Sequence, residues 1–236
     1  MLSIVLPCYN PPKHWDSYLV SQYQILREQI GEDLELIVVN DGSRHGVEDR
    51  HISRLRQEIP HFSYVHYPVN KGKGYAIRQG MQQARGTVLI YTDIDFPYST
   101  GSFMEVYRQL ETGACDVAVG IKDDHYYKGV PMLRRIISRS LRFLIRIFLR
   151  IPITDTQCGL KGFNRKVLPL FLQTGIDRYL FDLEFIRNCF AAGKFNVEAI
   201  PVRLNEGVVF RKMNYRVLIP EFINFIRVSF KKPHEK

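Results

Sequence analysis

The sequence contains few cysteines, and they form neither a disulfide framework nor a metal-binding pattern. Four cysteines, at positions 8, 115, 158 and 189, are spread over 236 residues without a CxxC pair. A small disulfide-stapled secreted domain and a zinc-ribbon site are therefore excluded. We expect four reduced thiols in a reducing compartment.

Membrane-spanning runs, export signals and two common nucleotide motifs are also missing. No run reaches the roughly 18 apolar residues that a spanning helix needs, because arginines interrupt every candidate. Only a short apolar run without a basic lead-in precedes Pro7, which does not fit a signal peptide. The first strand is not followed by GxGxxG, and GxxxxGK followed by Ser or Thr does not occur, which disfavours a dinucleotide cofactor and a Walker-type site. We therefore expect a cytoplasmic protein.

The positive charge of the chain is confined to two segments. With 33 Lys and Arg against 24 Asp and Glu, the net charge is +9. Residues 122–150 carry eight basic and two acidic side chains, and residues 211–236 carry seven and two, so the remainder of the chain is net acidic. No recognition motif or row of stacking aromatics accompanies these segments, and we expect no nucleic-acid partner.

Short apolar runs alternate with helical patterns in the first half of the chain. Strands are predicted at 2–6, 34–39, 62–67, 88–91 and 117–121, all buried on both faces, and helices at 15–30, 47–58, 73–84 and 102–111. This alternation indicates βαβ units, and hence an α/β fold with a mostly parallel sheet flanked by helices. After about residue 122 the rhythm changes to a mixed C-terminal part. Ligands of such sheets bind at the carboxyl ends of the strands.

Polar loops follow four of these strands, and one of them carries two carboxylates. Asp93 and Asp95 come directly after the apolar run 87–91 and can direct their oxygens at one Mg²⁺ or Mn²⁺, leaving positions open for substrate phosphates. Alone, such a pair is more often an Asx turn or a helix N-cap. Asp41 is similarly ambiguous, since it belongs to an Asp-Gly turn pair but can also accept from a ribose or a base. The loop 70–74 (NKGKG) places glycines and lysines just before the N-terminus of a helix. A helix N-terminus favours anions, so this loop is predicted to bind an anionic group of a ligand.

In their order along the chain, these loops resemble the motifs of family 2 glycosyltransferases, which have the GT-A (Rossmann-like) fold. The matching stretches over residues 1–121 are PCYN at 7–10, VNDGS at 39–43, NKGKG at 70–74 and DID at 93–95. Further along, DTQCG at 155–159 and RYLFDLE at 178–184 resemble polyprenyl-phosphate hexosyltransferases, in particular dolichyl-phosphate glucosyltransferases. This second resemblance reaches about residue 206.

The resemblance implies a role for each matching residue. Contacts to the nucleotide sugar are implied for Pro7, Tyr9, Asn10, Asp41, Lys73, Asp93 and Lys161, and we add Arg211 on its position and charge. The metal would be held by Asp93 and Asp95. The catalytic set would be Asp95, Asp155, Gln157 and Asp182, with Glu184 next to Asp182 beneath the reaction centre. From the residues alone, Asp182 and Glu184 read instead as an exposed face of a helix at 180–192.

A basic amphipathic helix is predicted at 131–149. Its arginines at 135, 139, 142 and 146 form one stripe beside a wide apolar arc, which suits the surface of an anionic membrane. An ordinary core-packing helix with solvated arginines explains the pattern equally well. Arg134 and Ser138 lie one turn apart and match an Arg-x-x-x-Ser arrangement that related enzymes use for a lipid phosphate. Lys122 stands where such enzymes often have arginine, so we expect it to bind the acceptor phosphate as a point charge.

Together these features predict an inverting, metal-dependent transferase that moves a hexose from a nucleotide diphosphate sugar, of UDP-glucose or GDP-mannose type, to a polyprenyl phosphate. We expect one GT-A domain over residues 1–210, with a nucleotide-sugar half at 1–121 and an acceptor half at 122–210, followed by an amphipathic basic segment at 211–236. The protein would bind the cytoplasmic face of a membrane peripherally, with an integral membrane protein as a further partner. Two alternatives stay open, a family 2 transferase acting on a sugar hydroxyl and a non-catalytic nucleotide-sugar-binding subunit.

Overall fold

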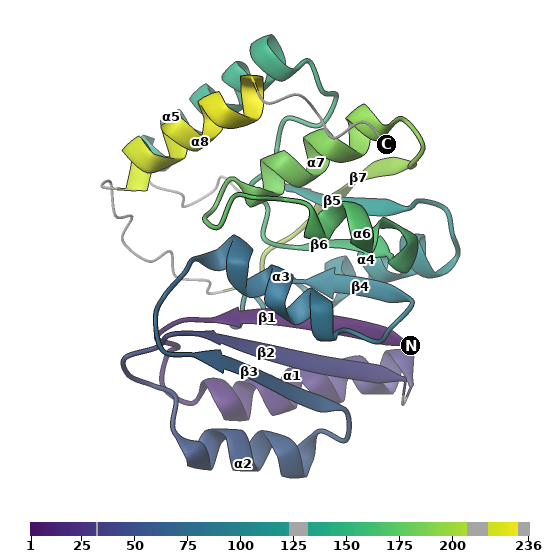
Figure 1. The fold of residues 1–236 in the computed structure, drawn as a ribbon. Coiled ribbons are helices and arrows are strands. Elements are labelled where there is room, and N and C mark those ends of the chain that lie inside the picture. The colour runs from purple at the N-terminus through teal and green to yellow at the C-terminus, as the bar shows by residue number, and fades with distance from the viewer. Residues whose placement is uncertain (32, 123–131, 207–216, 231–236) are drawn as a thin grey trace.

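One mixed β-sheet forms the centre of the molecule (Figure 1). The computed structural model describes residues 1–31, 33–122, 132–206 and 217–230, without the side chains of residues 133 and 134. The strands of this sheet are β1 (Leu2–Cys8), β2 (Leu34–Asp41), β3 (Phe62–Tyr67), β4 (Val88–Tyr91), β5 (Val117–Lys122), β6 (Lys161–Asn164) and β7 (Val197–Val202). Their order is β3-β2-β1-β4-β6-β5-β7, and only β6 runs antiparallel to its neighbours.

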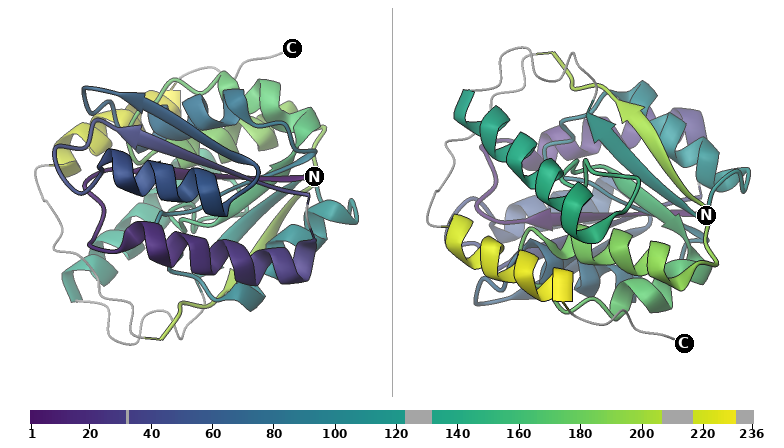
Figure 2. Two further views of the ribbon diagram at one scale, coloured as in Figure 1. Left: turned by 90° about the horizontal axis from the view of Figure 1, so that it is seen from below. Right: turned by 90° about the horizontal axis from the view of Figure 1, so that it is seen from above.

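Helices cover both faces of the sheet (Figure 2). One face packs against α1 (Trp15–Ile30), α2 (Asp49–Glu58) and α4 (Thr100–Glu111). The other face packs against α3 (Lys73–Gln83), α6 (Leu168–Leu172) and α7 (Phe181–Ala192). On this second side, α5 (Met132–Leu144) runs into a π-helical turn at Ile145–Leu149, and α8 (Leu218–Phe230) lies at the same end of the molecule (Figure 1).

The strands form because their side chains are apolar on both faces. In β1, Ile4 and Leu6 face the core on the α1 side, whereas Val5 faces the core on the α3 side, as the period of two requires. The predicted alternation of strands and helices is therefore confirmed, with most ends within two residues. The predicted burial on both faces is wrong for β3, which is only partly buried because it is the edge strand of the sheet.

Close packing of α3 on the sheet depends on Gly80. A Cβ atom at this position would lie 2.4 Å from Cγ1 of Val5 and 2.9 Å from Cγ2 of Val39. A side chain here would push α3 away from β1 and β2, so glycine at this position lets the helix pack close against the sheet.

The antiparallel strand β6 brings the second half of the chain to the end of β4. In the register of the two strands, Lys161 at the start of β6 pairs with Tyr91 at the end of β4. The loop that precedes Lys161 consequently lies beside the loop that follows Tyr91. No parallel strand would do this, because its preceding loop would lie at the opposite edge of the sheet.

The helices of the described ranges are all too short or too polar to cross a bilayer.

Candidate active site

Loops from four strands meet at the carboxyl edge of the sheet, as predicted. The amide of Asn70, after β3, donates to the carboxylate of Asp41 at the end of β2 at 2.8 Å. The side-chain oxygen of Asn10, after β1, accepts the backbone N–H of Arg44 at 2.9 Å. The ammonium of Lys73 contacts Asp93 after β4. The edge is therefore a continuous set of polar loops held together by side chains.

The loop after β4 is a tight turn that presents both carboxylates. The backbone N–H of Phe96 donates to the carbonyl of Asp93 at 3.0 Å, and Phe96 has a positive φ of 40°, which is uncommon for an aromatic residue. Asp95 is exposed, and the side chain of Asp93 is 39% exposed. The N-cap of the following helix α4 is Ser99, whose hydroxyl accepts from Ser102. The alternative that this aspartate pair caps a helix is therefore wrong.

Lys73 forms an ion pair with Asp93. Nζ of Lys73 lies 2.5 Å from Oδ1 of Asp93, and a fifth of the lysine side chain is exposed. Burial lowers the pKa of this lysine, but the carboxylates of Asp93 and Asp182 raise it, and the net result is a raised pKa. Lys73 is therefore a cation at neutral pH, paired with Asp93 and stabilised by the charge of Asp182.

Asp41 is buried and shapes the loop that carries Lys73. Besides Asn70, its carboxylate accepts the backbone N–H groups of Lys71 at 2.7 Å and Gly72 at 3.0 Å. Gly72 has a φ of 112°, and a Cβ atom there would lie 2.5 Å from the carbonyl oxygen of Asp177. The described contacts of Asp41 thus lie within the protein, and its predicted contact with a base or ribose stays a prediction.

The loop after β1 presents its predicted residues at the surface. The ring of Tyr9 is 43% exposed and Pro7 is partly exposed. Asn10 has a positive φ of 47°, and its backbone N–H donates to the hydroxyl of Ser43 at 2.9 Å. Asn10 therefore joins the loops after β1 and β2, and Tyr9 beside it offers an exposed ring to a ligand.

The segment 155–159 lies against the paired carboxylates. Gly159 is so close to Asp93 that a Cβ atom would lie 2.5 Å from its Oδ2. Upstream in this segment, Asp155 is buried and accepts the backbone N–H of Lys122 at 2.9 Å, while Nζ of Lys122 lies 3.7 Å from its other oxygen. Gln157 is partly exposed, and its amide contacts Thr156 at 3.4 Å. The structure thus brings the second predicted motif directly to the first.

Asp182 and Lys161 form a buried pair beneath this edge. Oδ1 of Asp182 lies 3.2 Å from Nζ of Lys161 and accepts the hydroxyl of Tyr91 at 2.5 Å. Burial raises the pKa of Asp182, although Lys161 and Lys73 oppose the rise. The reading of this helix face as exposed is wrong, since Asp182 is 5% and Glu184 3% exposed. Glu184 binds the backbone N–H groups of residues 175 and 176.

Asp93 and Asp95 fit a divalent cation such as Mg²⁺ or Mn²⁺. Both offer the hard oxygen ligands that these ions prefer, and Oδ1 of Asp93 already accepts a cation, the ammonium of Lys73. Within the described ranges, no cluster of three or more His, Cys, Asp or Glu could hold a metal. A cation bound here by one or two carboxylates would therefore take further ligands from water or substrate phosphates.

Two of the three residues predicted to bind the acceptor phosphate lie in α5. Arg134 and Ser138 are one turn apart in α5, as expected, and Ser138 is partly exposed; the side chain of Arg134 is outside the described part. Arg211, which was predicted to contact the nucleotide sugar, lies outside the described residues altogether. The structure therefore neither joins these residues to the site nor separates them from it.

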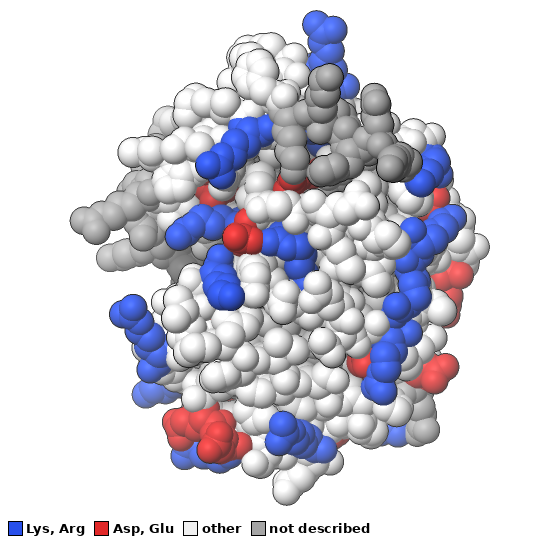
Figure 3. Space-filling model, viewed as in Figure 1, with Lys and Arg blue, Asp and Glu red and all other residues white. Residues whose placement is uncertain are grey.

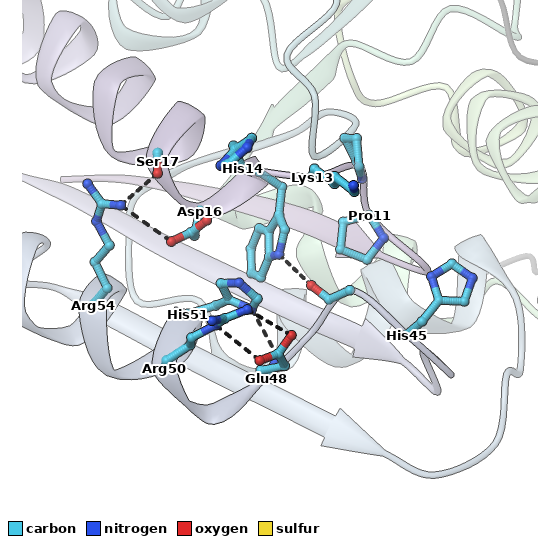
Figure 4. A pocket seen from close by; sticks show the side chains of 13 residues that line it. Pro11, Lys13, His14, Asp16, Ser17, His45, Glu48, Arg50, His51 and Arg54 are labelled. Atoms are coloured by element: carbon cyan, nitrogen blue, oxygen red, sulfur yellow. Dashed lines mark hydrogen bonds and ion pairs between the residues drawn. The ribbon is translucent and has the colours of Figure 1, made fainter.

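A hollow of about 710 Å³ lies between the N-termini of α1 and α2 (Figure 4). The indole nitrogen of Trp15 donates across it to the carbonyl of Gly46 at 2.8 Å. Its arginines have partners, since Arg50 pairs with Glu48 at 3.0 Å and Arg54 contacts the hydroxyl of Ser17 at 2.6 Å. Both arginines are thus bound to groups of the protein, and we assign the hollow no ligand.

Two tyrosines at the site were not foreseen. The hydroxyl of Tyr98 accepts the backbone N–H of Gly159 at 2.7 Å, and that of Tyr91 binds Asp182. Both rings are buried among apolar residues. Tyr98 lies three residues after Asp95. The sequence around a tyrosine in an apolar stretch does not show whether its hydroxyl forms a hydrogen bond in the core or whether the ring serves only for packing.

The chain matches known transferases in sequence and in fold. The model of the family described as Glycosyl transferase family 2 matches residues 3–171. The glycosyltransferase AglD of Haloferax volcanii is 29% identical over 85% of this chain and 32% of its own length. Dolichyl-phosphate beta-glucosyltransferase of Saccharomyces cerevisiae is 27% identical over 87% of this chain and 67% of its own. The chain thus spans a third to two thirds of these relatives.

Solved structures resemble the whole described fold at low sequence identity. Glucosyl-3-phosphoglycerate synthase of Mycobacterium tuberculosis, crystallised with Mn²⁺, UDP and phosphoglyceric acid, has a TM-score of 0.65 at 16% identity, covering 100% of this chain and 80% of that one. Mannosyl-3-phosphoglycerate synthase of Rubrobacter xylanophilus has a TM-score of 0.66 at 16% identity, covering 97% and 72%. The fold is therefore GT-A. Since the family model covers more than two thirds of the sequence, the chain belongs to glycosyl transferase family 2.

Proposed function

We propose that this protein transfers a hexose from a nucleotide diphosphate sugar to a polyprenyl phosphate at a membrane surface, with inversion at the anomeric carbon. The observation that carries the proposal is the position of Asp93 and Asp95 at the exit of β4, with Lys73 on one side and the segment 155–159 on the other. The UDP bound in the solved relative supports a nucleotide donor. The name of the yeast relative supports a polyprenyl phosphate acceptor and glucose as the sugar.

In this reaction an oxygen of the acceptor phosphate forms a bond with the anomeric carbon, and the nucleoside diphosphate leaves with the electron pair of the broken C–O bond. A Mg²⁺ or Mn²⁺ ion held by Asp93 and Asp95 would neutralise the charge that develops on the departing diphosphate. Lys73 adds a fixed positive charge next to these carboxylates. The acceptor phosphate is anionic at pH 7, so no side chain has to remove a proton from it.

This last point separates the proposal from transfer to a sugar hydroxyl. A hydroxyl acceptor needs a general base within hydrogen-bonding reach. Asp182, from the predicted catalytic set, is the candidate for this base. It is 5% exposed, however, and its carboxylate binds Tyr91 and Lys161. These contacts favour an acceptor that is already ionised.

The acceptor side is proposed to be the end of the molecule formed by α5 and α8. The rings of Phe148 and Phe225 meet edge to face with centroids 6.2 Å apart, which joins the two helices. Many large apolar side chains of this end are more than a third exposed: Met132, Ile136, Phe143, Ile147, Phe148, Leu218, Ile219, Phe222, Ile223, Ile226 and Phe230. Arg139, Arg146 and Arg150 are exposed among them. In Figure 3 this end shows mainly uncharged side chains with a few basic ones.

An exposed apolar surface of this extent with basic side chains suits an anionic lipid surface. Arg134 and Ser138 of α5 are proposed to bind the phosphate of the acceptor, together with Lys122 at the end of β5, whose ammonium lies beside Asp155. Peripheral binding to the cytoplasmic face, with an integral membrane partner, is part of the same proposal.

The function is tested by supplying the purified protein with polyprenyl phosphate, Mn²⁺ and a panel of labelled nucleotide sugars, UDP-glucose and GDP-mannose among them. We expect label in the lipid fraction with one donor. Transfer to a free glycan but not to the lipid would favour the hydroxyl-acceptor alternative. Binding of a donor without transfer to either acceptor would favour a non-catalytic subunit.

Membrane binding is tested with the variant Ile219→Ser/Phe222→Ser, which removes two apolar side chains that are 72% and 57% exposed. We expect affinity for vesicles of mixed neutral and anionic lipid to fall roughly 10-fold or more per residue, because each side chain loses its burial in the membrane. Co-sedimentation with vesicles at low and high salt measures it. Ile25→Ser, which alters an exposed apolar residue of α1, is the matched control. Equal vesicle binding by the variant and the wild type would contradict a lipid-binding role for α8.

A further inference from the structure

We infer that Lys161 and Tyr98 are positioning residues for the carboxylate of Asp93: they hold the turn at Cys158 and Gly159 against it and so set its affinity for a divalent cation. The inference rests on the proposed function, because it concerns the cation of the donor site. It gives Lys161 a task that differs from contact with the donor sugar.

Lys161 is completely buried, and its ammonium binds groups of the protein itself. The side chain is 0% exposed, and Nζ donates to the backbone carbonyl of Cys158 and lies 3.2 Å from Asp182. A buried ammonium is costly unless all of its hydrogens are used. A hydrophobic residue would fill the same space at lower cost, so the charge of Lys161 is explained by the groups that it holds in place.

The carbonyl of Cys158 belongs to the peptide unit that leads into Gly159. Since Lys161 binds this carbonyl on one side and Tyr98 accepts the N–H of Gly159 at 2.7 Å, both polar groups of one peptide unit are fixed by side chains. Lys161 comes from β6 and Tyr98 from the loop after β4, so the turn is attached to two separate parts of the fold. The peptide is therefore held in one orientation.

Gly159 then limits where the carboxylate of Asp93 can lie. A Cβ atom at Gly159 would be 2.5 Å from Oδ2 of Asp93, so only a glycine lets the peptide come this close. The other oxygen, Oδ1, is held by Lys73 at 2.5 Å. The carboxylate of Asp93 is consequently confined between an ammonium on one side and a fixed peptide on the other. Loss of a group that orients a metal ligand typically lowers metal affinity by about 10- to 100-fold.

The inference is tested by measuring Mn²⁺ affinity in the presence of UDP, using the electron paramagnetic resonance signal of free Mn²⁺. No acceptor or sugar is needed, so the result does not depend on the donor sugar or on the lipid. We expect Gly159→Ala to weaken Mn²⁺ binding roughly 10- to 100-fold. Gly101→Ala is the matched control, because a Cβ atom there meets nothing within 4 Å. It should bind Mn²⁺ as the wild type does.

Two further variants separate positioning from a role in folding alone. Tyr98→Phe removes a single hydroxyl, keeps the buried ring and should weaken Mn²⁺ binding less than Gly159→Ala. The pair Lys161→Met/Asp182→Asn removes both buried charges together and so avoids an uncompensated ion. It should recover the melting temperature better than Lys161→Met alone but should not recover Mn²⁺ affinity.

Wild-type affinity for Mn²⁺ in Gly159→Ala and in the double variant would overturn the inference. Wild-type protein that binds no Mn²⁺ with UDP would instead overturn the proposed metal site itself, and the inference would fall with it. Binding of UDP without metal should be the same in Gly159→Ala, Gly101→Ala and the wild type, and a parallel loss of that binding in Gly159→Ala would also count against positioning of Asp93.

Discussion

Replacing Asp93 by asparagine is expected to lower the rate of hexose transfer roughly 100- to 1000-fold without unfolding the protein. Asparagine keeps the size of the side chain but removes the negative charge that would hold the divalent cation. It also removes the charge that pairs with the ammonium of Lys73, which lies 2.5 Å away. The magnitude corresponds to the loss of one group that stabilises charge developing in a transition state. Transfer rates measured over a series of Mn²⁺ concentrations, together with thermal unfolding, provide the check.

The matched control for this variant is Asp49→Asn, which alters an exposed carboxylate in the first turn of α2. It removes the same charge and should keep the rate of the wild type. A near-normal rate for Asp93→Asn, with unchanged dependence on Mn²⁺, would remove the metal-binding role of the turn after β4. Loss of activity together with loss of the folded state would mean that Asp93 supports the fold.

Replacing Asp182 by alanine is expected to lower the free energy of unfolding by about 3–5 kcal/mol. The substitution leaves the ammonium of Lys161 buried without its carboxylate partner and removes the acceptor for the hydroxyl of Tyr91. Such a loss is a large fraction of the 5–15 kcal/mol that is typical of folded proteins. Urea unfolding followed by circular dichroism measures it.

Arg50→Ala is a useful control for Asp182→Ala, because it breaks an ion pair in which both side chains are more than half exposed. That pair should contribute less than about 1 kcal/mol. If Asp182→Ala kept the stability of the wild type and lost only activity, Asp182 would be acting on the substrate. This result would favour a sugar hydroxyl as the acceptor, since such an acceptor needs a base.

Much of the site could be predicted because loops after parallel strands share one edge of the sheet. The apolar runs before Asp41 and Asp93 marked two strand ends, and the topology then required both aspartates to lie at that edge. The ion pair between Lys73 and Asp93 could not be predicted in this way. It joins the first residue of α3 to the loop after β4, and the position of α3 on the sheet is set by tertiary packing.

The buried residues behind the edge were harder to interpret from sequence. A helical pattern marks which side of a helix is polar, but it does not show whether a second element covers that side. Asp182 and Glu184 therefore read as solvent-exposed, although Lys161 from β6 and the backbone N–H groups of residues 175 and 176 bind them. The predicted burial of the partly exposed edge strand β3 was wrong for the same reason. Burial depends on neighbours that are far away in the chain.

By itself, the sequence determined the α/β alternation and the edge of the sheet at which the polar loops with Asp41 and Asp93 meet, because these follow from local periodicity and from loop position. The tertiary structure decided that β6 runs antiparallel between β4 and β5, which sets Gly159 against Asp93 and buries Lys161 with Asp182. Strand direction and charge burial are set by contacts between segments some 60 to 90 residues apart, and no local pattern records such contacts.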